Sequence, residues 1–162
     1  MIKKTVGILD FKINNIASIF NCLTKIENLH IKIINDIDDL KNLNHLIIPG
    51  VGTFGSAINN LKKKNFLEEV LFFSKSKNNF ILGICLGAQL LFEKSEEDEK
   101  KNFGFGIFEG ECKAMISNDE NIKIPHIGWN KVIFVKNQKI LANIQDSFYA
   151  YFVHGYYIIP SM

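Results

Sequence analysis

The sequence predicts an α/β fold, with a mostly parallel sheet, helices on both faces and an antiparallel extension in the C-terminal third. Two observations predict it. Over the first two thirds of the 162 residues, short apolar segments alternate with helical patterns, which is the order of a parallel sheet. Beyond residue 102 the apolar segments follow one another without long helices between them, which favours antiparallel strands.

The first strand is expected at 5–9, where the residues read Thr-Val-Gly-Ile-Leu. A helix follows at 15–26, because its apolar residues recur at helical spacing. These residues form one stripe, which consists of Ile16, Ile19, Phe20 and Leu23. A second strand is expected at 31–34, and a third at 45–48 is apolar enough to be buried on both faces.

Helices are expected next at 57–61 and 66–74, followed by a strand at 80–84 and a helix at 88–94. Segment 94–102 is dense in Glu, Asp and Lys, so it predicts a solvated loop or helix tail. The carboxyl ends of the parallel strands meet at one edge of the sheet, where we expect functional residues to gather.

The C-terminal third contains three further candidate strands, at 111–115, 131–135 and 148–152. The chain shows neither a repeat nor a low-complexity linker. We therefore expect residues 1–162 to form a single domain, which is long enough to bury a core.

Composition argues against several classes of protein. No apolar run approaches the roughly 20 residues of a membrane span, and the N-terminus lacks the pattern of a signal peptide. Cys22, Cys85 and Cys112 are odd in number and widely spaced, which suits a reducing cytoplasm. No pair of Cys or His has metal-ligand spacing, and we expect no cofactor. All 19 basic residues are lysines, which disfavours a sequence-specific DNA reader.

Residues 83–87 read Gly-Ile-Cys-Leu-Gly between a strand and a helix, which is the pattern of a nucleophile elbow. The two glycines let neighbouring backbone approach closely. The start of the helix directs its free N–H groups at the sulfur, which favours thiolate and can stabilise an oxyanion. The alternative is a buried core cysteine, which is the interpretation that we give to Cys22 and Cys112.

Four blocks resemble a known family. Residues 83–92 (Gly-Ile-Cys-Leu-Gly-Ala-Gln-Leu-Leu-Phe) are similar to the nucleophile motif of class I, triad-type glutamine amidotransferases. Residues 49–54 (Pro-Gly-Val-Gly-Thr-Phe) resemble that family's oxyanion loop. Residues 125–130 (Pro-His-Ile-Gly-Trp-Asn) and 151–157 (Tyr-Phe-Val-His-Gly-Tyr-Tyr) are similar to blocks of the glutaminase subunits of imidazole glycerol phosphate synthase, an enzyme of histidine biosynthesis.

The resemblance implies a flavodoxin-like amidotransferase fold and a glutaminase chemistry. Cys85 would attack the side-chain amide of glutamine, release ammonia and form a thioester that water hydrolyses. The backbone N–H groups of Val51 and Leu86 would hold the oxyanion. The residues implied in glutamine binding are Gly50, Gly52, Gln89, Gly155 and Tyr156. For Gln89, the residues alone favour a solvent-facing helix position.

The resemblance also implies a partner, a (β/α)8-barrel cyclase subunit that receives the ammonia and closes an imidazole ring. The chain would form a heterodimer with it through Asn15, Trp129 and Tyr151. Trp129 lies between a glycine and an asparagine in an expected loop, which favours an interface anchor. Core packing remains an equal alternative for Tyr151.

The chain departs from the family at the general base. That base and its orienting group come from a His-x-Glu pair, and none of His30, His45, His126 and His154 is followed by the glutamate. For His154 we expect a structural or substrate-adjacent role. We expect the chain to lack the family's final segment, and to hydrolyse glutamine poorly by itself.

The first loop departs as well, since Lys12 stands where the family has a glycine. Asn14 could take a left-handed conformation there, whereas Lys12 lacks glycine's freedom. The changed loop leaves open a paralogue that serves the amination of a surface sugar.

Two further alternatives stay open, a catalytically incompetent docking module and a different cysteine hydrolase. The hydrolase would place a histidine close after the elbow cysteine, whereas here Leu86 follows Cys85.

Overall fold

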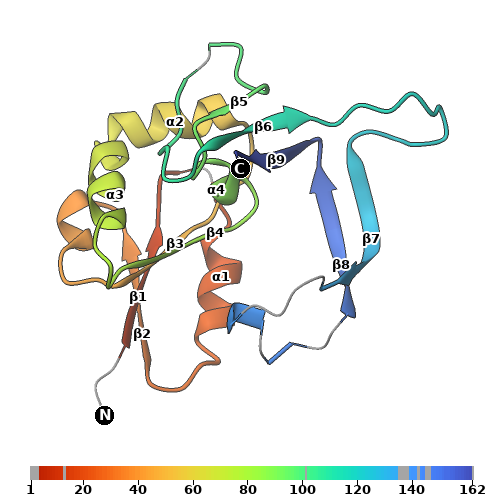
Figure 1. Cartoon of the computed structure of the whole chain (residues 1–162). Coiled ribbons are helices and arrows are strands. Elements are labelled where there is room, and N and C mark those ends of the chain that lie inside the picture. The colour runs from red at the N-terminus through yellow and green to blue at the C-terminus, as the bar shows by residue number, and fades with distance from the viewer. Residues whose placement is uncertain are drawn as a thin grey trace. The chain divides into compact units, whose positions relative to one another are not determined.

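The computed structural model describes residues 4–12, 14–100, 102–134, 139–141, 143–144 and 147–161. The chain divides into two compact units (Figure 1). The first unit consists of Met1–Lys113 with Ile158–Met162, and the second consists of Ala114–Tyr157. The expectation of a single domain stays a prediction. No helix among the described residues is long and apolar enough to cross a membrane.

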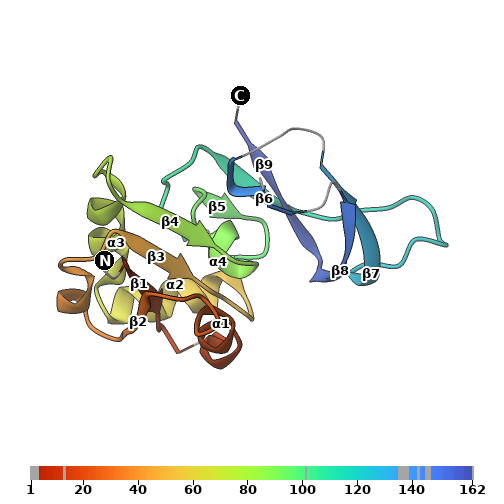
Figure 2. The same cartoon turned by 90° about the horizontal axis from the view of Figure 1, so that it is seen from below.

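The first unit is built on a four-stranded parallel sheet in the order β2-β1-β3-β4. Its strands are β1 (Lys4–Leu9), β2 (Leu29–Ile34), β3 (His45–Ile48) and β4 (Phe80–Gly83). The expected parallel sheet is confirmed. Ile48 pairs with Gly83 at the carboxyl ends of β3 and β4, which run side by side toward α4 in Figure 2. The segments that follow these two strands are therefore neighbours.

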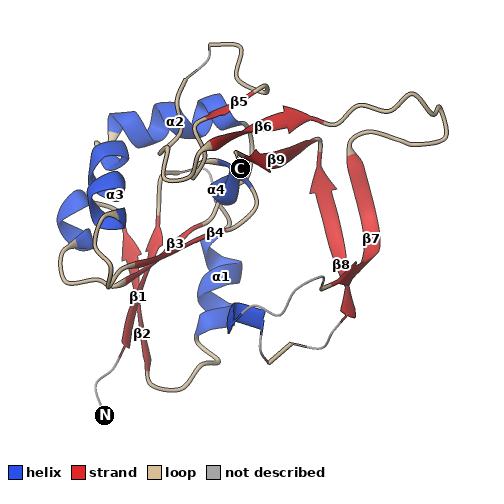
Figure 3. Cartoon of the chain, viewed as in Figure 1, coloured by secondary structure: helices blue, strands red, loops and turns tan. Residues whose placement is uncertain are grey.

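Helices lie on both faces of this sheet, as expected, but only one face is well covered. Figure 3 shows α2 and α3 on one side of the strands and α1 on the other. The helices of this unit are α1 (Ile16–Leu23), the 3-10 helix η1 (Ile37–Leu40), α2 (Phe54–Lys63), α3 (Phe66–Ser74) and α4 (Leu86–Gln89). No residue of α1 is fully buried, because one eight-residue helix covers little of a four-stranded sheet. Phe80 and Leu82 of β4 are 61% and 43% exposed.

The hydrophobic core of this unit lies between the sheet and the pair α2 and α3. Leu9, Ile34 and Ile48 of the strands are fully buried in it. From the two helices it takes Phe54, Ala57, Ile58, Leu61, Phe66, Val70 and Phe73. Each fully buried side chain of leucine or phenylalanine size stabilises the fold by roughly 1.5–3 kcal/mol. This packing fixes α2, and with it the end of the loop that leads from β3.

The expectation of a solvated loop or helix tail at 94–102 holds only in part, since most described residues of the segment are turns or loop and are exposed. Its first residues form the short strand β5 (Lys94–Ser95), and Ser95 and Asp98 are buried. The Glu97 carboxylate accepts a hydrogen bond from the Phe54 N–H at 2.7 Å, where α2 begins. Thr53, at the N-cap position of α2, makes no side-chain cap bond, so Glu97 satisfies this helix end from a distant segment. Residue 101 lies outside the described part of the chain.

The helix after the elbow is also shorter than expected. It ends at Gln89, and Leu91 and Phe92 lie in a turn and bend rather than in the helix expected to residue 94. Leu90, Leu91 and Phe92 are all buried, so tertiary packing decides their backbone conformation.

Downstream, β5 pairs in parallel with β6 (Gly110–Ala114), which carries the strand expected at 111–115. β9 (Tyr156–Pro160) completes this three-stranded sheet.

The second unit contains a long antiparallel pair, which confirms the expected change of topology. It consists of β7 (His126–Ile133) and β8 (Ser147–His154), and the 3-10 helix η2 (Lys139–Leu141) lies between them in sequence. The register pairs His126 with His154. Both strands are longer than the 131–135 and 148–152 expected, and Val135 lies outside the described residues.

Candidate active site

Cys85 lies between β4 and α4 in a strained backbone conformation, with φ 55° and ψ −119°. An L residue at positive φ costs about 1–2 kcal/mol, and such strain gathers at functional sites. The side chain of Cys85 is exposed, so the alternative of a core cysteine is wrong for this residue. The geometry is that of a nucleophile held at a sharp strand-to-helix turn.

Both glycines of the elbow are sterically required. A β-carbon at Gly83 would lie 2.5 Å from the Ala88 α-carbon, and one at Gly87 would collide with the Ile48 carbonyl oxygen. A β-carbon at Gly50 would lie 2.9 Å from the Gly87 nitrogen. The elbow and the loop at 49–52 are therefore packed backbone against backbone, and no side chain fits between them.

The N–H groups at the start of α4 are only partly free, which corrects the sequence expectation. Gly87 N–H donates to the Ile84 carbonyl at 3.0 Å, and Ala88 N–H donates to the Cys85 carbonyl at 2.9 Å. Among the described hydrogen bonds, none uses the N–H of Leu86 or of Val51. These are the two donors that the resemblance implies for the oxyanion. Each is therefore available to an incoming oxygen.

The loop that carries Val51 has the backbone freedom such a role needs. Gly52 has φ 88°, in the left-handed region, whereas Gly50 makes the close contact with α4. The Val51 side chain is 51% exposed, and Leu86 is buried. Gln89 is half-buried and lies one helical turn after Cys85. The structure thus brings Gly50, Val51, Gly52, Leu86 and Gln89 around the elbow.

The two remaining cysteines differ from each other. Cys112 is fully buried, and its thiol lies 3.8 Å from the Gln89 carbonyl oxygen, to which it donates. Burial raises the pKa of Cys112 to about 11, with the negative charges of Glu97 and Glu111 acting in the same direction. Cys22 is exposed on α1, so the expectation of core packing is wrong for it.

The first loop takes an unexpected conformation. The left-handed residue is Lys12, at φ 73°, although it lacks glycine's freedom. The Asp10 carboxylate stabilises it by accepting the Lys12 N–H at 2.8 Å. Asn14 is not among the residues with positive φ; its side-chain amide donates to the Leu9 carbonyl at 2.9 Å. Asn15 is exposed and is the N-cap of α1, since its side chain accepts the Ser18 N–H.

The remaining predicted residues lie in the second unit. Trp129 and Tyr151 are paired across β7 and β8, with ring centroids 5.6 Å apart. They are 69% and 54% exposed, so the alternative of core aromatics is wrong for both. Gly155 joins β8 to β9, and Tyr156 is the first residue of β9; both are half-buried. His154 donates from Nδ1 to the Tyr156 carbonyl, which gives it a structural contact beside these residues.

Neither histidine of the first unit is placed to act as a base for Cys85. His45 begins β3 and stacks on Phe80 with centroids 5.2 Å apart, and His30 is exposed near the start of β2. Both are at the amino ends of their strands, whereas Cys85 follows a carboxyl end. The described residues contain no group of three or more His, Cys, Asp or Glu side chains that could hold a metal ion.

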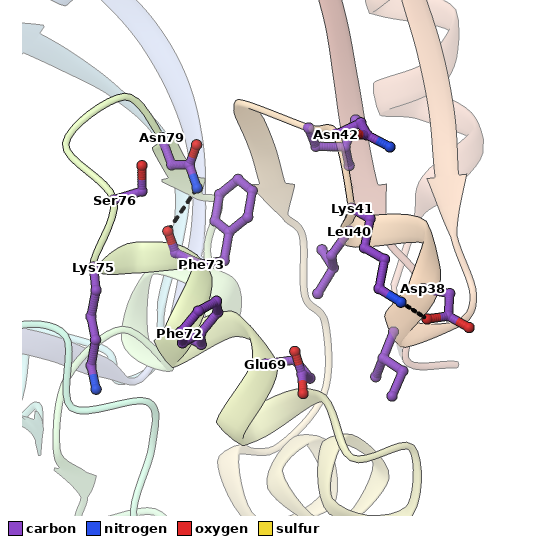
Figure 4. Close-up of a pocket in the computed structure, with 12 residues that line it drawn as sticks. Asp38, Leu40, Lys41, Asn42, Glu69, Phe72, Phe73, Lys75, Ser76 and Asn79 are labelled. Carbon is purple, nitrogen blue, oxygen red and sulfur yellow. Dashed lines mark hydrogen bonds and ion pairs between the residues drawn. The ribbon is translucent and has the colours of Figure 1, made fainter.

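A pocket of about 600 Å³ lies away from this site, between η1 and the end of α3 (Figure 4). Its walls carry Phe72, Phe73 and Leu40, and Lys41 at its rim is ion-paired with Asp38 at 2.6 Å. The lining segments precede β3 and β4, so they lie at the amino edge of the sheet. None of the predicted site residues lines this pocket.

Comparison with known proteins first defines the class. The profile of the family described as Glutamine amidotransferase class-I matches residues 7–162, which include the elbow and the loop packed on it. The chain belongs to the class I glutamine amidotransferases. Two solved structures support the fold, each with a TM-score of 0.65. One is a glutamine amidotransferase, 16% identical, with 91% of this chain and 70% of that chain covered. The second is a putative GMP synthase component from Thermoplasma acidophilum, 18% identical, with 97% and 67% covered.

Within that family the chain is similar to proteins named imidazole glycerol phosphate synthase subunit HisH. The protein from Sulfurimonas denitrificans is 37% identical over 156 residues, which cover 95% of this chain and 73% of the relative. The one from Caldanaerobacter subterraneus is 40% identical over 153 residues, with 94% and 72% covered. The one from Bacillus subtilis is 35% identical, with 94% and 72% covered. These relatives confirm the resemblance stated from the four sequence blocks.

Two tertiary contacts could not be found from the sequence. Glu97 holds the start of α2 from 43 residues away, and no local pattern marks it. The contact between His126 and His154 joins residues 28 apart. Only the register of β7 with β8 brings these two rings together, and the sequence motifs do not state that register.

Proposed function

We propose that this chain is a glutaminase subunit in which Cys85 is the nucleophile. The observation that carries the proposal is the exposed cysteine at positive φ in an elbow whose glycines are packed against the loop at 49–52. An acyl-transfer site needs backbone N–H donors for the oxyanion, because negative charge develops on the substrate oxygen.

The steps follow from this geometry. The Cys85 sulfur attacks the side-chain carbonyl carbon of glutamine, and the carbonyl electron pair moves to the oxygen. The Val51 and Leu86 N–H groups, free in the described hydrogen bonds, stabilise that oxyanion. When the carbonyl re-forms, the C–N bond breaks and the nitrogen leaves as ammonia after it takes up a proton. Water then cleaves the thioester to glutamate and restores the thiol.

In this proposal the glutamine is held by groups next to the nucleophile. Gln89 lies one turn along α4 from Cys85, and Gly50 and Gly52 shape the loop beside it. The family resemblance also implies glutamine contacts from the backbone at Gly155 and Tyr156, which belong to the second unit. None of these roles needs a cofactor, because each step is a nucleophilic substitution at an acyl carbon.

The partner surface is one face of the β7–β8 pair, which we call the odd face because its residues have odd numbers. Its apolar members are Ile127, Trp129, Ile133, Tyr149, Tyr151 and Val153, each more than half exposed. A contiguous apolar face of this kind marks a protein interface. The relatives are named as subunits of a synthase, and we propose a (β/α)8-barrel cyclase as the partner. Ammonia then passes to it for imidazole ring closure in histidine biosynthesis.

A second candidate is a docking module without turnover. It is favoured by the positions of His30 and His45, which lie at the amino ends of their strands, whereas Cys85 follows a carboxyl end. A docking module that had no base would leave the Cys85 proton without an acceptor and the leaving nitrogen without a donor, so its turnover would be slow. The two candidates agree on the partner surface and differ in catalysis.

The test is ammonia release from glutamine by the 162-residue chain, with and without the barrel cyclase, and with Cys85→Ala as the control. Release that requires Cys85 supports the glutaminase. Binding to the cyclase without release supports the docking module. A chain that is folded but neither binds the cyclase nor releases ammonia contradicts both. A glycan-pathway synthase in place of the cyclase tests the paralogue that aminates a sugar.

A further inference from the structure

The loop at 49–53 joins β3 to α2 and carries the Val51 N–H. Its start is held against the elbow by close backbone contacts. A β-carbon at Gly50 would lie 2.9 Å from the Gly87 nitrogen, and one at Gly87 would collide with the Ile48 carbonyl oxygen. Because close-packed backbone tolerates little displacement, the first residues of the loop are placed by α4.

The end of the loop is held by Glu97. Thr53, at the N-cap position of α2, makes no side-chain cap bond, and its hydroxyl shares a hydrogen bond of 2.9 Å with the Ser56 hydroxyl. The first N–H of the helix, that of Phe54, donates instead to the Glu97 carboxylate at 2.7 Å. A carboxylate is favoured here because it accepts from an otherwise unpaired N–H and faces the positive end of the helix. Glu97 therefore fixes the point at which the loop becomes helix.

The Glu97 carboxylate is itself held in place by its neighbours. β5 pairs with β6, and the Glu97 N–H donates to the hydroxyl oxygen of the buried Ser95 at 3.2 Å. The next residue, Asp98, is also buried, and a β-carbon at Gly55 would lie 2.7 Å from its Oδ1 atom. The segment is thus packed against the first turn of α2, and Glu97 reaches the Phe54 N–H from a fixed backbone.

Val51 lies between these two fixed points. Only residues 51–53 separate Gly50 from the Phe54 N–H. The Val51 side chain is 51% exposed and Gly52 has φ 88°, so this short stretch is held neither by core packing nor by the steric restriction of a side chain at Gly52. The direction of the Val51 N–H is therefore set by the two ends of the loop. A displacement of about 1 Å in a reacting or stabilising group costs on the order of 100-fold in rate.

We propose that Glu97 is a positioning residue for the loop at 49–53. By accepting the Phe54 N–H, it directs the Val51 N–H toward the substrate oxygen. The inference rests on the proposed function for the roles of Cys85 and Val51, and all four residues belong to the first unit. A negative charge close to a developing oxyanion is unfavourable, so the contribution of Glu97 comes from the hydrogen bond that it accepts and not from its charge.

The test is acylation of Cys85 in the 162-residue chain by the γ-(p-nitrophenyl) ester of glutamate. The thiolate forms a C–S bond with the ester carbon, the C–O bond breaks, and its electron pair leaves on nitrophenolate, which needs no proton donor. The burst of nitrophenolate gives the acylation rate at saturation and the half-saturating ester concentration, with Cys85→Ala as the background. We expect Glu97→Ala to lower the saturated rate about tenfold and to leave the half-saturating concentration unchanged.

Two conservative variants separate the reach of the side chain from its charge. Glu97→Gln keeps the length and an acceptor oxygen, so we expect it to restore most of the acylation rate. Glu97→Asp keeps the charge but is shorter by one CH2 group, so it should be as slow as Glu97→Ala. Glu99→Gln, at an exposed position of the same segment, is the matched control and should change neither quantity. Acylation that is fast in Glu97→Asp and slow in Glu97→Gln contradicts the proposal.

The outcomes distinguish this inference from the proposed function. Wild-type release that does not saturate, or that persists in Cys85→Ala, contradicts the glutaminase site itself, and the positioning role falls with it. A lower thermal midpoint of Glu97→Ala with an unchanged acylation rate indicates a role in stability alone and overturns the positioning role. A raised half-saturating concentration at an unchanged rate indicates direct contact with the substrate and overturns it as well. Where Glu97→Ala does not fold, the comparison of Glu97→Asp with Glu97→Gln decides.

Discussion

The α-carbon of Gly87 lies against the carbonyl oxygen of Ile48, with no room for a β-carbon between them. The contact joins the helix after the nucleophile to the end of β3. It is reinforced by the Ile84 N–H, which donates to the same carbonyl at 3.0 Å. The position of Cys85 relative to the Val51 loop is therefore set by backbone atoms, which tolerate much less displacement than flexible side chains.

Gly87→Ala should destabilise the fold strongly. The added methyl group collides with backbone that cannot move without shifting β3, so we expect a loss of about 3 kcal/mol in the free energy of unfolding. Urea denaturation measures it. Gly155→Ala is the matched control, because the nearest atom to its added carbon is 3.6 Å away. Equal stability of the two variants contradicts the packing described for the elbow.

Glu97→Ala should weaken the start of α2. The carboxylate accepts the Phe54 N–H at 2.7 Å, and its loss leaves a helix N-terminus without a cap. We expect a cost of about 1–2 kcal/mol in unfolding free energy. Glu97→Gln keeps an acceptor oxygen and should lose roughly half as much. Glu99→Gln, at an exposed position in the same segment, serves as the control and should lose nothing measurable.

Lys12→Gly should stabilise the chain, which is unusual for a change to glycine. Lys12 has φ 73°, and a glycine there is free of the strain of an L residue. The gain is reduced by the greater freedom of glycine in the unfolded chain, so the net expectation is about 0.5–1 kcal/mol. The exposed ion pair of Lys12 with Asp10, at 3.8 Å, adds little. If the thermal midpoint of Lys12→Gly is lower than that of the wild-type chain, this interpretation of the loop is contradicted.

Alkaline pH should destabilise the chain through Cys112. Burial raises the pKa of its thiol from 9.0 to about 11, so the unfolded chain gives up this proton first as the pH rises. The stability is therefore complete below about pH 9 and is lost progressively toward pH 11, by at most about 3 kcal/mol. Cys112→Ala should flatten this part of the stability profile. A wild-type profile that is flat over the same range contradicts the assignment.

The sequence was sufficient for the parts of the fold that local patterns determine. The strands at 5–9 and 45–48 and the elbow at Cys85 follow from apolar runs, breakers and flanking glycines, and the structure places them within a residue or two. The patterns could not show how far the helix after Cys85 continues. Leu90 to Phe92 are as apolar as a helix stripe, but they turn into the core.

The missed features depend on distant partners. Segment 94–102 reads as a solvated loop because its charges are dense, and only the position of α2 shows that Glu97 has a backbone donor to bind. The apolar stripe of α1 predicts burial, but burial needs a second surface, and the described residues give that helix little of one. At Lys12, by contrast, the partner is local. A single hydrogen bond from the Lys12 N–H to the Asp10 carboxylate stabilises a backbone conformation that lysine rarely adopts.

The most direct test of the account is alkylation of the chain by a chloroketone analogue of glutamine, followed by mass spectrometry. The Cys85 sulfur displaces chloride from the analogue, a reaction that requires the thiolate and the glutamine site but no general base. We expect saturable labelling of Cys85, protection by glutamine, and no labelling of the exposed Cys22 beyond its rate with iodoacetamide. Labelling of Cys85 that neither saturates nor is slowed by glutamine contradicts the claim that this elbow is a glutaminase site.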